Sequence, residues 1–219
     1  VAQEARTICR LVVAVDFSGE KLRIARQERA ALVLQSNLHA LALSAQAFDL
    51  ALAGFAFNAT DPSLGFGEVF RVLKPGGRLV MMEWDTLDAL SELVSDTLVE
   101  YAVEDPPPEL AAMRELLGNS IPWDDLEDES DLAGLLRQTG FVSVETENLS
   151  IPVRFESVKA FIGYKTAWPS RQVELAAMPE DVRQLCLSDL TENLNALARP
   201  DGSLLWQPNV IRARAYKAD

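Results

Sequence analysis

The acid Asp16 is the first residue whose type and position indicate chemistry. It ends the short apolar run LVVAVD, and Ser18 follows as a suitable N-cap for the next helix. An acid at the carboxyl end of a strand in an open parallel sheet can accept both hydroxyls of a ribose. We therefore predict a nucleotide-type ligand at Asp16, Phe17 and Ser18. The alternative is an exposed acid that is favoured by the dipole at a helix N-terminus.

Ala53, Gly54 and Phe55 form the second stretch that could bind a ligand. They end the apolar run FDLALAGF, and ligands of open parallel sheets lie beyond the carboxyl ends of the strands. Glycine lets a ligand approach the backbone closely, and the ring of Phe55 could pack on that ligand. Core packing is the alternative, because most aromatic side chains are largely buried.

These residues are positioned by a strand, helix and strand that together span Phe48–Trp84. The runs FDLALAGF and GRLVMMEW are of strand length, and the segment between them is apolar at helical spacing. The helical face consists of Phe66, Val69, Phe70 and Leu73. Pro75, Gly76 and Gly77 are predicted to end this helix, because proline cannot continue it and glycine supplies a positive φ. Two apolar strands joined through a helix predict a parallel sheet.

The rest of the chain extends this alternation of strands and helices. Residues 1–10 are predicted to be helical, and LVVAVD and AALVL to be strands, in the order of a doubly wound fold. In the second half, Ser130 is the expected N-cap of a helix that Gly140 closes. FVSVETE and residues 210–217 alternate apolar and polar side chains, as strands with one exposed face do. The last strand therefore suits an antiparallel position.

The motifs in these segments resemble a known family. A strand that begins with Phe48 and Asp49, followed by RVLKPGG and a second apolar strand, is similar to the class I S-adenosylmethionine-dependent methyltransferases. The resemblance is to their small-molecule, UbiE-like and methyltransferase-11-like branch, and it covers Val1–Trp84. It implies a Rossmann-like, mostly parallel α/β sheet with an antiparallel last strand and a helical lid. It also implies S-adenosylmethionine as the cofactor, with the ribose on Asp16.

The resemblance further implies a role for the loop Gln35–Ser44. Asn37 and Leu38 lie where the family usually carries an acid and a small or apolar residue at the adenine. The Asn37 oxygen can still accept a hydrogen bond from the adenine amino group, and a surface loop is the alternative. His39, the only histidine, is considered as a general base because imidazole suits neutral pH. A solvated side chain is the favoured interpretation of His39.

One element of the family has no counterpart in this sequence. Val1–Ser18 resembles the helix that follows the family's GxGxG loop and then the second strand of its sheet. The first strand and the glycine loop therefore have no place in the sequence. Either they precede it in the natural protein or the protein has lost them, and we expect the former.

The chain is long enough for one sizeable α/β domain, and we predict a single domain over residues 1–219. The sheet core is expected in residues 1–84, 130–154 and 207–219, and the helical lid in residues 85–128 and 155–205. Tyr101, Tyr164 and Trp168 of the lid are the candidate substrate-binding residues. Core packing is the alternative for each of them.

Charge and composition exclude several classes of partner. Lys and Arg number 20 against 33 Asp and Glu, a net charge of −13. Such a surface repels phosphate backbones, so we expect no nucleic-acid partner. No apolar run approaches the roughly 18 residues of a membrane span and no signal-peptide pattern opens the sequence, so we expect a cytoplasmic protein with no membrane partner. Cys9 and Cys186 lack metal-ligand spacing, and we expect no metal site. A homodimer stays open.

The function predicted from these residues is transfer of the S-adenosylmethionine methyl group to an O, N or C nucleophile of a small molecule, by in-line displacement. The sulfonium already activates the methyl group, so the protein mainly supplies alignment and a dry pocket. One alternative is a catalytically inactive relative that serves as a binding or scaffold protein. The other is an NAD(P)-binding oxidoreductase domain, because such domains carry an acid at the position of Asp16.

Overall fold

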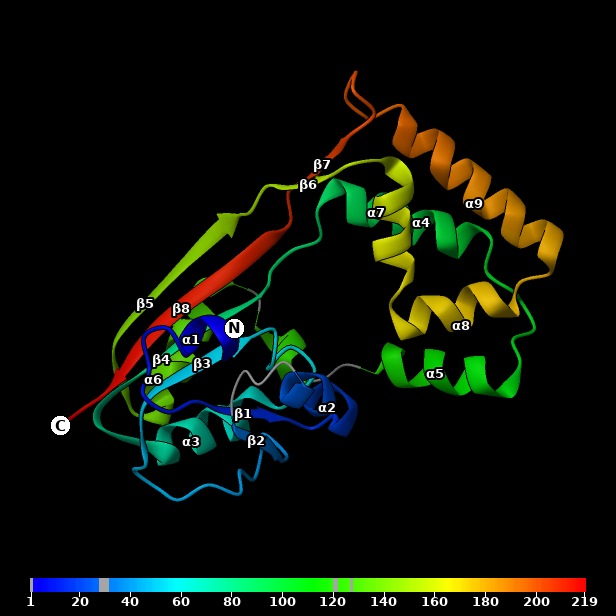
Figure 1. The fold of residues 1–219 in the computed structure, drawn as a ribbon. Coiled ribbons are helices and arrows are strands. Elements are labelled where there is room, and N and C mark those ends of the chain that lie inside the picture. The colour runs from blue at the N-terminus through cyan, green and yellow to red at the C-terminus, as the bar shows by residue number, and fades with distance from the viewer. Residues whose placement is uncertain (1, 28–31, 120–121, 127) are drawn as a thin grey trace. The chain divides into compact units, whose positions relative to one another are not determined.

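The computed structural model describes residues 2–27, 32–119, 122–126 and 128–219, which form two compact units (Figure 1). The sheet unit comprises Val1–Trp84, Ile121–Asn148 and Ile211–Asp219. The helical unit comprises Asp85–Ser120 and Leu149–Val210. This division resembles the expected division into core and lid, with two differences. Residues 149–154 and 207–210 belong to the helical unit, and the end of the first expected lid segment, from Ile121, belongs to the sheet unit. The expectation of a single domain stays a prediction.

The sheet unit is a mixed α/β structure. Its strands are β1 (Val13–Asp16), β2 (Leu32–Gln35), β3 (Phe48–Gly54), β4 (Leu73–Trp84), β5 (Phe141–Ser150) and β8 (Asn209–Lys217). Its helices are α1 (Ala2–Ala5), α2 (Gly19–Gln27), α3 (Pro62–Val72), the 3₁₀ turn η1 (Pro122–Asp125) and α6 (Glu129–Thr139). β1 pairs with β2 and β3 pairs with β4, both in parallel. β8 lies between β4 and β5 and runs opposite to β5 (Figure 1), which confirms the predicted antiparallel last strand.

The core of the sheet unit lies between two helices and one face of the larger sheet. α3 and α6 contribute apolar side chains at helical spacing, and β4 and β8 contribute alternate residues because side chains of a strand alternate between faces. The buried members are Phe57, Phe66, Val69, Leu73, Leu79, Met81, Leu132, Leu136, Phe141, Ile211, Ala213 and Ala215. This packing fixes which side chains of β4 point into the helix-covered layer.

The prediction that Pro75–Gly77 ends a helix is wrong. α3 ends at Val72, and the Lys74–Gly77 segment bulges out of β4, since Leu73 pairs with Phe48 and Arg78 with Leu50. Gly76 has a φ of 70°, which a side chain would strain. A Cβ at Gly77 would lie 2.8 Å from the Lys74 carbonyl oxygen. The motif therefore shapes a bulge in a strand, while Lys74 pairs with Asp49 at 2.8 Å instead of serving a helix end.

Two other boundaries differ from the sequence expectation. α1 covers only Ala2–Ala5, because the Thr7 hydroxyl donates to the Glu4 carbonyl at 2.7 Å and competes with continuation of the helix. Val1 and the first residues of AALVL, Ala30 and Ala31, lie outside the described residues. α6 is capped by Asp128, not Ser130, since the Asp128 carboxylate accepts from the backbone N–H groups of Ser130 and Asp131.

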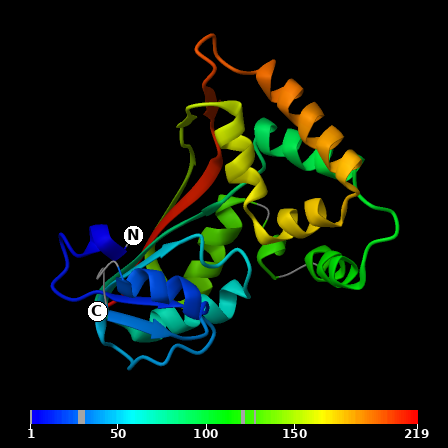
Figure 2. The same ribbon diagram turned by 45° about the vertical axis from the view of Figure 1, so that its right-hand side comes forward.

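The helical unit contains five α-helices and one two-stranded antiparallel sheet within the described residues. They are α4 (Ala89–Glu100), α5 (Pro108–Gly118), α7 (Val158–Thr166), α8 (Pro169–Ala177) and α9 (Glu180–Asn195), with β6 (Val153–Phe155) and β7 (Leu204–Trp206). α9 packs on α4 and α7, and α8 packs on α5 and α7 (Figure 2). β7 pairs antiparallel with β6 and was not predicted, because three residues are too short to show a periodicity.

Candidate functional site

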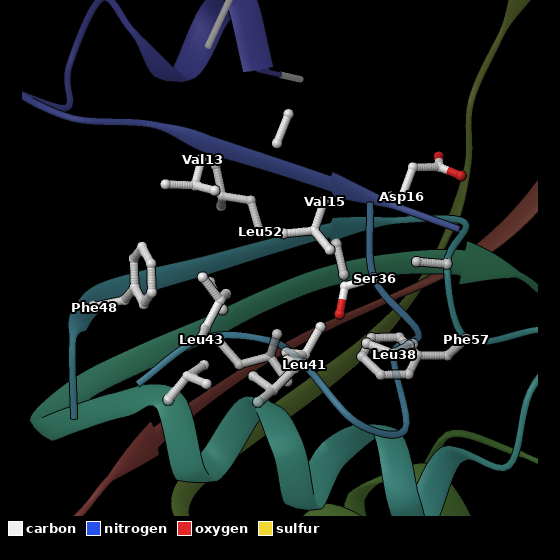
Figure 3. A pocket seen from close by; sticks show the side chains of 18 of the residues that line it. Val13, Val15, Asp16, Ser36, Leu38, Leu41, Leu43, Phe48, Leu52 and Phe57 are labelled. Carbon is white, nitrogen blue, oxygen red and sulfur yellow. The ribbon is translucent and has the colours of Figure 1, made fainter. Parts of the chain in front are cut away.

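The sheet unit contains a cavity of about 800 Å³, within the usual size of small-molecule sites. Its walls come from β1, the loop after β2, β3 with its following loop, and α3. Figure 3 shows Val13 and Val15 of β1 near Leu52 of β3, with Leu41 and Leu43 of the loop on the opposite side. Polar groups among the lining residues are few: Asp16, Lys21, Ser36, Asn37, His39, Asn58 and Thr60. A mostly apolar cavity with few polar groups suits an organic ligand.

The cavity lies along two strand edges. Within the described residues, β1 pairs only with β2 and β3 pairs only with β4, so the two parallel pairs form separate sheets. Residues of both β1 and β3 line the cavity, up to the carboxyl ends of the strands at Asp16 and Gly54. Ligands of open parallel sheets bind at such carboxyl ends. The topology therefore places the two predicted binding stretches around one cavity.

Asp16 sits in a turn that leaves its carboxylate with free acceptor capacity. Its Oδ1 accepts from the Ser18 backbone N–H at 2.8 Å, and a carboxylate has further lone pairs. The Gln35 side chain donates to the Phe17 carbonyl at 3.0 Å and ties this turn to β2. The ring of Phe17 is 76% exposed. Asp16 and Phe17 line the cavity, whereas Ser18 does not and instead accepts from the Lys21 N–H at the start of α2.

The loop after β2 carries three predicted residues, and all three line the cavity. Asn37 Oδ1 accepts from the His39 backbone N–H at 2.9 Å, and Leu38 packs against the core. His39 Nε2 accepts from the Asp61 backbone N–H at 3.1 Å. The lone pair that a general base would use is therefore engaged in holding the loop to the start of α3.

The same loop is fastened to α3 by Arg71 and Glu68. Arg71 donates to the carbonyls of Leu41 and Leu43 at 2.9 and 2.8 Å, and Glu68 accepts from the Leu41 N–H at 2.6 Å. The hydrogen bond from Arg71 keeps the pKa of Glu68 below its usual range. Arg71 is the first residue of the RVLKPGG motif, so this part of the motif positions a wall of the cavity.

The end of β3, with Ala53 and Gly54, and the first residue of the following loop, Phe55, form part of the cavity wall. Phe55 has a φ of 56°, unusual for a residue with a side chain, and its ring stacks on Trp84 with centroids 4.1 Å apart. Its N–H donates to the Met82 carbonyl at 2.8 Å. A strained conformation at a strand end is typical of functional sites.

Glu83 fastens this loop, and sequence reasoning missed it. Its Oε1 accepts from the backbone N–H groups of Ala56 and Phe57 at 2.6 and 2.8 Å. The side chain is fully buried, and burial raises its pKa to about 7 against the lowering effect of these N–H groups. An available signal was the acid that directly follows the apolar run LVMM, as Asp16 follows the run LVVAV.

Comparison with known proteins identifies similar methyltransferases. A family model described as a methyltransferase domain matches residues 1–81. A demethylmenaquinone methyltransferase of Clavibacter sepedonicus is 34% identical over 154 residues, which cover 64% of this chain and 60% of the relative. The ubiquinone/menaquinone biosynthesis C-methyltransferase UbiE of Marinomonas sp. (strain MWYL1) is 29% identical over 157 residues, covering 64% and 59%. The chain thus spans about three fifths of these curated relatives.

A solved structure supports the fold. It is the phosphoethanolamine N-methyltransferase 2 of Haemonchus contortus in complex with S-adenosylhomocysteine, with a TM-score of 0.53 and 14% identity over 99% of this chain and 46% of that chain. The chain is therefore similar to the class I S-adenosylmethionine-dependent methyltransferases, in their UbiE-like branch. The resemblance read from RVLKPGG is thereby confirmed, as is the Rossmann-like α/β fold.

The three residues predicted to bind a substrate lie in the helical unit, and none of them lines the cavity. The Tyr101 hydroxyl donates to the Asp189 carboxylate, which raises the pKa of Tyr101 to about 12. Tyr164 packs against the rings of Phe155 and Trp206, with centroids 5.4 and 5.5 Å away. Trp168 is exposed at the start of α8. Their role with the substrate stays a prediction.

Two searches of the described residues were negative. No group of three or more His, Cys, Asp or Glu side chains in the described ranges could hold a metal ion. None of the helices in those ranges combines the length and the apolar character needed to cross a membrane.

Proposed function

We propose that the cavity of the sheet unit binds S-adenosylmethionine and that the protein transfers its methyl group to a small molecule. One observation carries the proposal: three stretches far apart in the sequence line the same cavity. They are Asp16 with Phe17, Asn37 with Leu38, and Ala53–Phe55. Their chemistry matches the three requirements of an adenosyl ligand, namely a ribose acceptor, an apolar slot with an amide, and a close backbone approach.

The residues fit the cofactor. The Asp16 carboxylate would accept from the ribose hydroxyls with lone pairs that the Ser18 N–H leaves free. The Asn37 oxygen accepts one N–H and has a second lone pair for the adenine amino group. Leu38 and the ring of Phe17 offer apolar faces for the base. The cavity of about 800 Å³ has room for the whole cofactor.

When bound, the cofactor supplies a methyl group that its sulfonium has already activated. The chain's own residues then have to bind and orient the two reactants and to exclude water. Alignment of this kind can lower the activation barrier by several kcal/mol. The site therefore needs no strong acid or base beside the methyl group. This agrees with a His39 ring nitrogen that is occupied by the Asp61 N–H.

The acceptor that the relatives favour is a quinone-type ring whose carbon is methylated. The names of the relatives state demethylmenaquinone methylation and C-methylation in ubiquinone and menaquinone biosynthesis. We extend this acceptor class to the present protein, with Tyr101, Tyr164 and Trp168 as the aromatic residues to test for it. Carbon is thereby preferred over the oxygen and nitrogen nucleophiles that the sequence left open.

The cofactor assignment is tested by calorimetric titration of the full chain with S-adenosylhomocysteine and, separately, with NADH. Micromolar binding of S-adenosylhomocysteine is expected, and Asp16→Ala should weaken it by about 10- to 100-fold, because two charge-assisted hydrogen bonds are lost. Asp49→Ala, at an exposed surface ion pair, is the matched control and should bind normally. Binding of NADH alone would favour an oxidoreductase, and binding of neither compound a scaffold protein.

We also infer that the natural protein contains the parallel strand and the glycine turn that the resemblance implies. The strand would pair along the open edges of β1 and β3. The support is that both edges line one cavity and that parallel strands are normally paired on both sides within a sheet. The intact mass of the natural protein tests this, since an additional N-terminal segment would raise it well above 24.1 kDa.

A further inference from the structure

Glu83 is a buried acid in a row of apolar side chains. Leu79, Met81 and Glu83 alternate along β4 and point into the layer that the helices cover, where all three are at most 1% exposed. A leucine or a methionine at position 83 would fill this space with apolar contacts alone. A carboxylate here instead has to be desolvated, which is unfavourable unless hydrogen bonds compensate.

The compensation comes from the loop that borders the cavity. Glu83 Oε1 accepts from the N–H groups of Ala56 and Phe57, which lie 27 and 26 residues away in sequence. Two short bonds to consecutive amides fix the path of the chain directly after the strained residue Phe55. They also fix Phe57, whose fully buried ring packs on Phe66 with centroids 4.5 Å apart.

Phe57 links this loop to the other wall of the cavity. A Cβ placed on Gly65 would lie 2.9 Å from the Phe57 ring and 3.3 Å from the Leu38 side chain, so both side chains meet at the same point of α3. Figure 3 shows Phe57 and Leu38 side by side at the cavity. Displacement of the Ala56–Phe57 backbone would therefore disturb the adenine side as well as the end of β3.

Compensation of Glu83 is incomplete. Its Oε2 is buried and has no hydrogen-bond partner, and within the described residues no ion pair involves Glu83. An arrangement that is unfavourable for stability, and that a packed apolar residue would avoid, is characteristic of residues kept for a functional site. The half-satisfied carboxylate therefore points to a role in the cavity rather than in the core.

We propose that Glu83 is a positioning residue of the cofactor cavity, holding the loop Gly54–Asn58 in its binding conformation through the ionised carboxylate. This inference rests on the proposed function. Glu83 is not among the residues that line the cavity, so it acts through Ala56 and Phe57. Hydrogen bonds to an ionised acceptor are roughly twice as strong as those to a neutral one, which makes the charge, and not only the shape, of the side chain matter.

Few titratable groups lie on the elements packed around Glu83. Asp61 and Glu68 belong to α3 and its cap, and their lowered pKa values keep both ionised near neutral pH. His39 belongs to the neighbouring loop. On β8 the two arginines alternate with the buried residues and pair with Glu145 and Glu147. No charge interaction with any of these groups contributes to the pKa of Glu83.

The test compares S-adenosylhomocysteine affinity at pH 6 and pH 8, on either side of the Glu83 pKa of about 7. The wild type should bind up to about tenfold more tightly at pH 8, because apparent affinity scales with the fraction of binding-competent protein. Glu83→Gln keeps the shape but not the charge. It should bind about tenfold more weakly than the wild type at pH 8 and lose the pH dependence.

The control is Glu145→Gln, the same chemical change at an exposed position of the same unit. It retains Glu83 and His39, so it should reproduce the affinities of the wild type at both pH values. Glu83→Leu leaves two amides unsatisfied and should weaken binding further, by about 10- to 100-fold relative to the wild type. Circular dichroism establishes that each variant is folded.

The outcomes separate this inference from the proposed function. A wild type that binds no S-adenosylhomocysteine would overturn both. A wild type that binds, together with a folded Glu83→Gln variant whose affinity and pH profile match those of Glu145→Gln, would overturn the positioning role alone. A lower melting temperature of Glu83→Gln with unchanged affinity would also overturn it, because that result describes a purely structural residue.

Discussion

The two units of this protein each bury an ionisable side chain, but in opposite ways. Glu83 of the sheet unit is fully buried, is held by backbone amides, and has one carboxylate oxygen without a partner. Lys165 of the helical unit is 6% exposed and has a hydroxyl and an aromatic ring as partners. Its counter-ion, Asp88, is one hydroxyl away. Among the residues that the structure describes, Glu83 has no counter-ion, whereas Lys165 has one.

The Lys165 cluster joins three elements of the helical unit. Lys165 of α7 donates to the Ser91 hydroxyl, and Ser91 of α4 donates to Asp88. Asp88 caps α4 and accepts from the Trp206 indole N–H of β7 at 2.8 Å. The Lys165 ammonium lies 4.1 Å from the centroid of the Trp206 ring, a distance suited to cation–π attraction. Lys165 and Asp88 both have hydrogen-bond partners within the cluster, so we infer that the cluster stabilises the fold of the helical unit.

The comparison shows that burial of a charge has no fixed meaning. A paired and hydrogen-bonded charge can be replaced by apolar residues with little effect on stability. The other kind of buried charge accepts hydrogen bonds only from the backbone of a neighbouring loop. Its desolvation is unfavourable, and its hydrogen bonds determine the conformation of that loop. We therefore expect substitutions in the two units to separate stability from binding.

The largest effect on stability is expected for Asp88→Ala. It removes the cap of α4 and leaves the Lys165 ammonium buried without its counter-ion, so the free energy of unfolding should fall by about 3–5 kcal/mol. Urea denaturation measures it. Asp61→Ala, which removes a cap of α3 without stranding a charge, is the control and should lose only about 1 kcal/mol. If Asp88→Ala combined with Lys165→Met is no more stable than Asp88→Ala, the stranded charge is not the cause.

The next effect concerns pH and Glu83. Burial raises the pKa of Glu83 from 4.5 to about 7, so the folded state binds more protons than the unfolded state between these values. The free energy of unfolding should therefore fall as the pH rises from 4.5 to 7, by on the order of 3 kcal/mol from this group. Glu83→Gln should remove this fall, as measured by urea denaturation across the pH range. An unchanged slope in the variant would assign the pH dependence to other groups.

The smallest effect is expected for Lys165→Met. An apolar side chain of similar length can pack on the Trp206 ring, so the free energy of unfolding at neutral pH should change by no more than about 1 kcal/mol. Burial lowers the pKa of Lys165 from 10.5 to about 8, against the attraction of Asp88. The unfolded state thus binds more protons between these values, and wild-type stability should rise from pH 8 to pH 10.5. The variant should lack this rise, and S-adenosylhomocysteine affinity should stay unchanged.

Much of the fold follows from local patterns. The alternation in residues 210–217 predicted a strand with Ile211, Ala213 and Ala215 buried, and the structure agrees. Periodicity located α3, but its end was misplaced because Pro75–Gly77 can interrupt a strand as well as a helix. The short strand β7 carried no detectable pattern, since its pairing with β6 depends on residues about 50 positions away.

The residues of the candidate site could also be predicted from the sequence only in part. Strand ends followed by suitable residues identified Asp16 and Gly54, because the ligand side of a parallel sheet is a property of strand direction. The role of Glu83 could not be read, since the sequence does not say which amides a buried carboxylate meets. Ser18 was placed in the site from sequence but caps α2 away from the cavity.

The sequence by itself indicated the family that the chain resembles, the order of strands and helices, and the stretches that border the cavity, because these depend on composition, periodicity and motifs along the chain. Only the tertiary structure decided that Asp16, Leu38 and Gly54 line one cavity. It alone decided that Glu83 holds the loop after β3. It also decided that the partners of the Lys165 ammonium come from the cluster formed by α4, α7 and β7. The physical reason is that the energy of a buried charge depends on which distant groups surround it, and those groups are brought together only by folding.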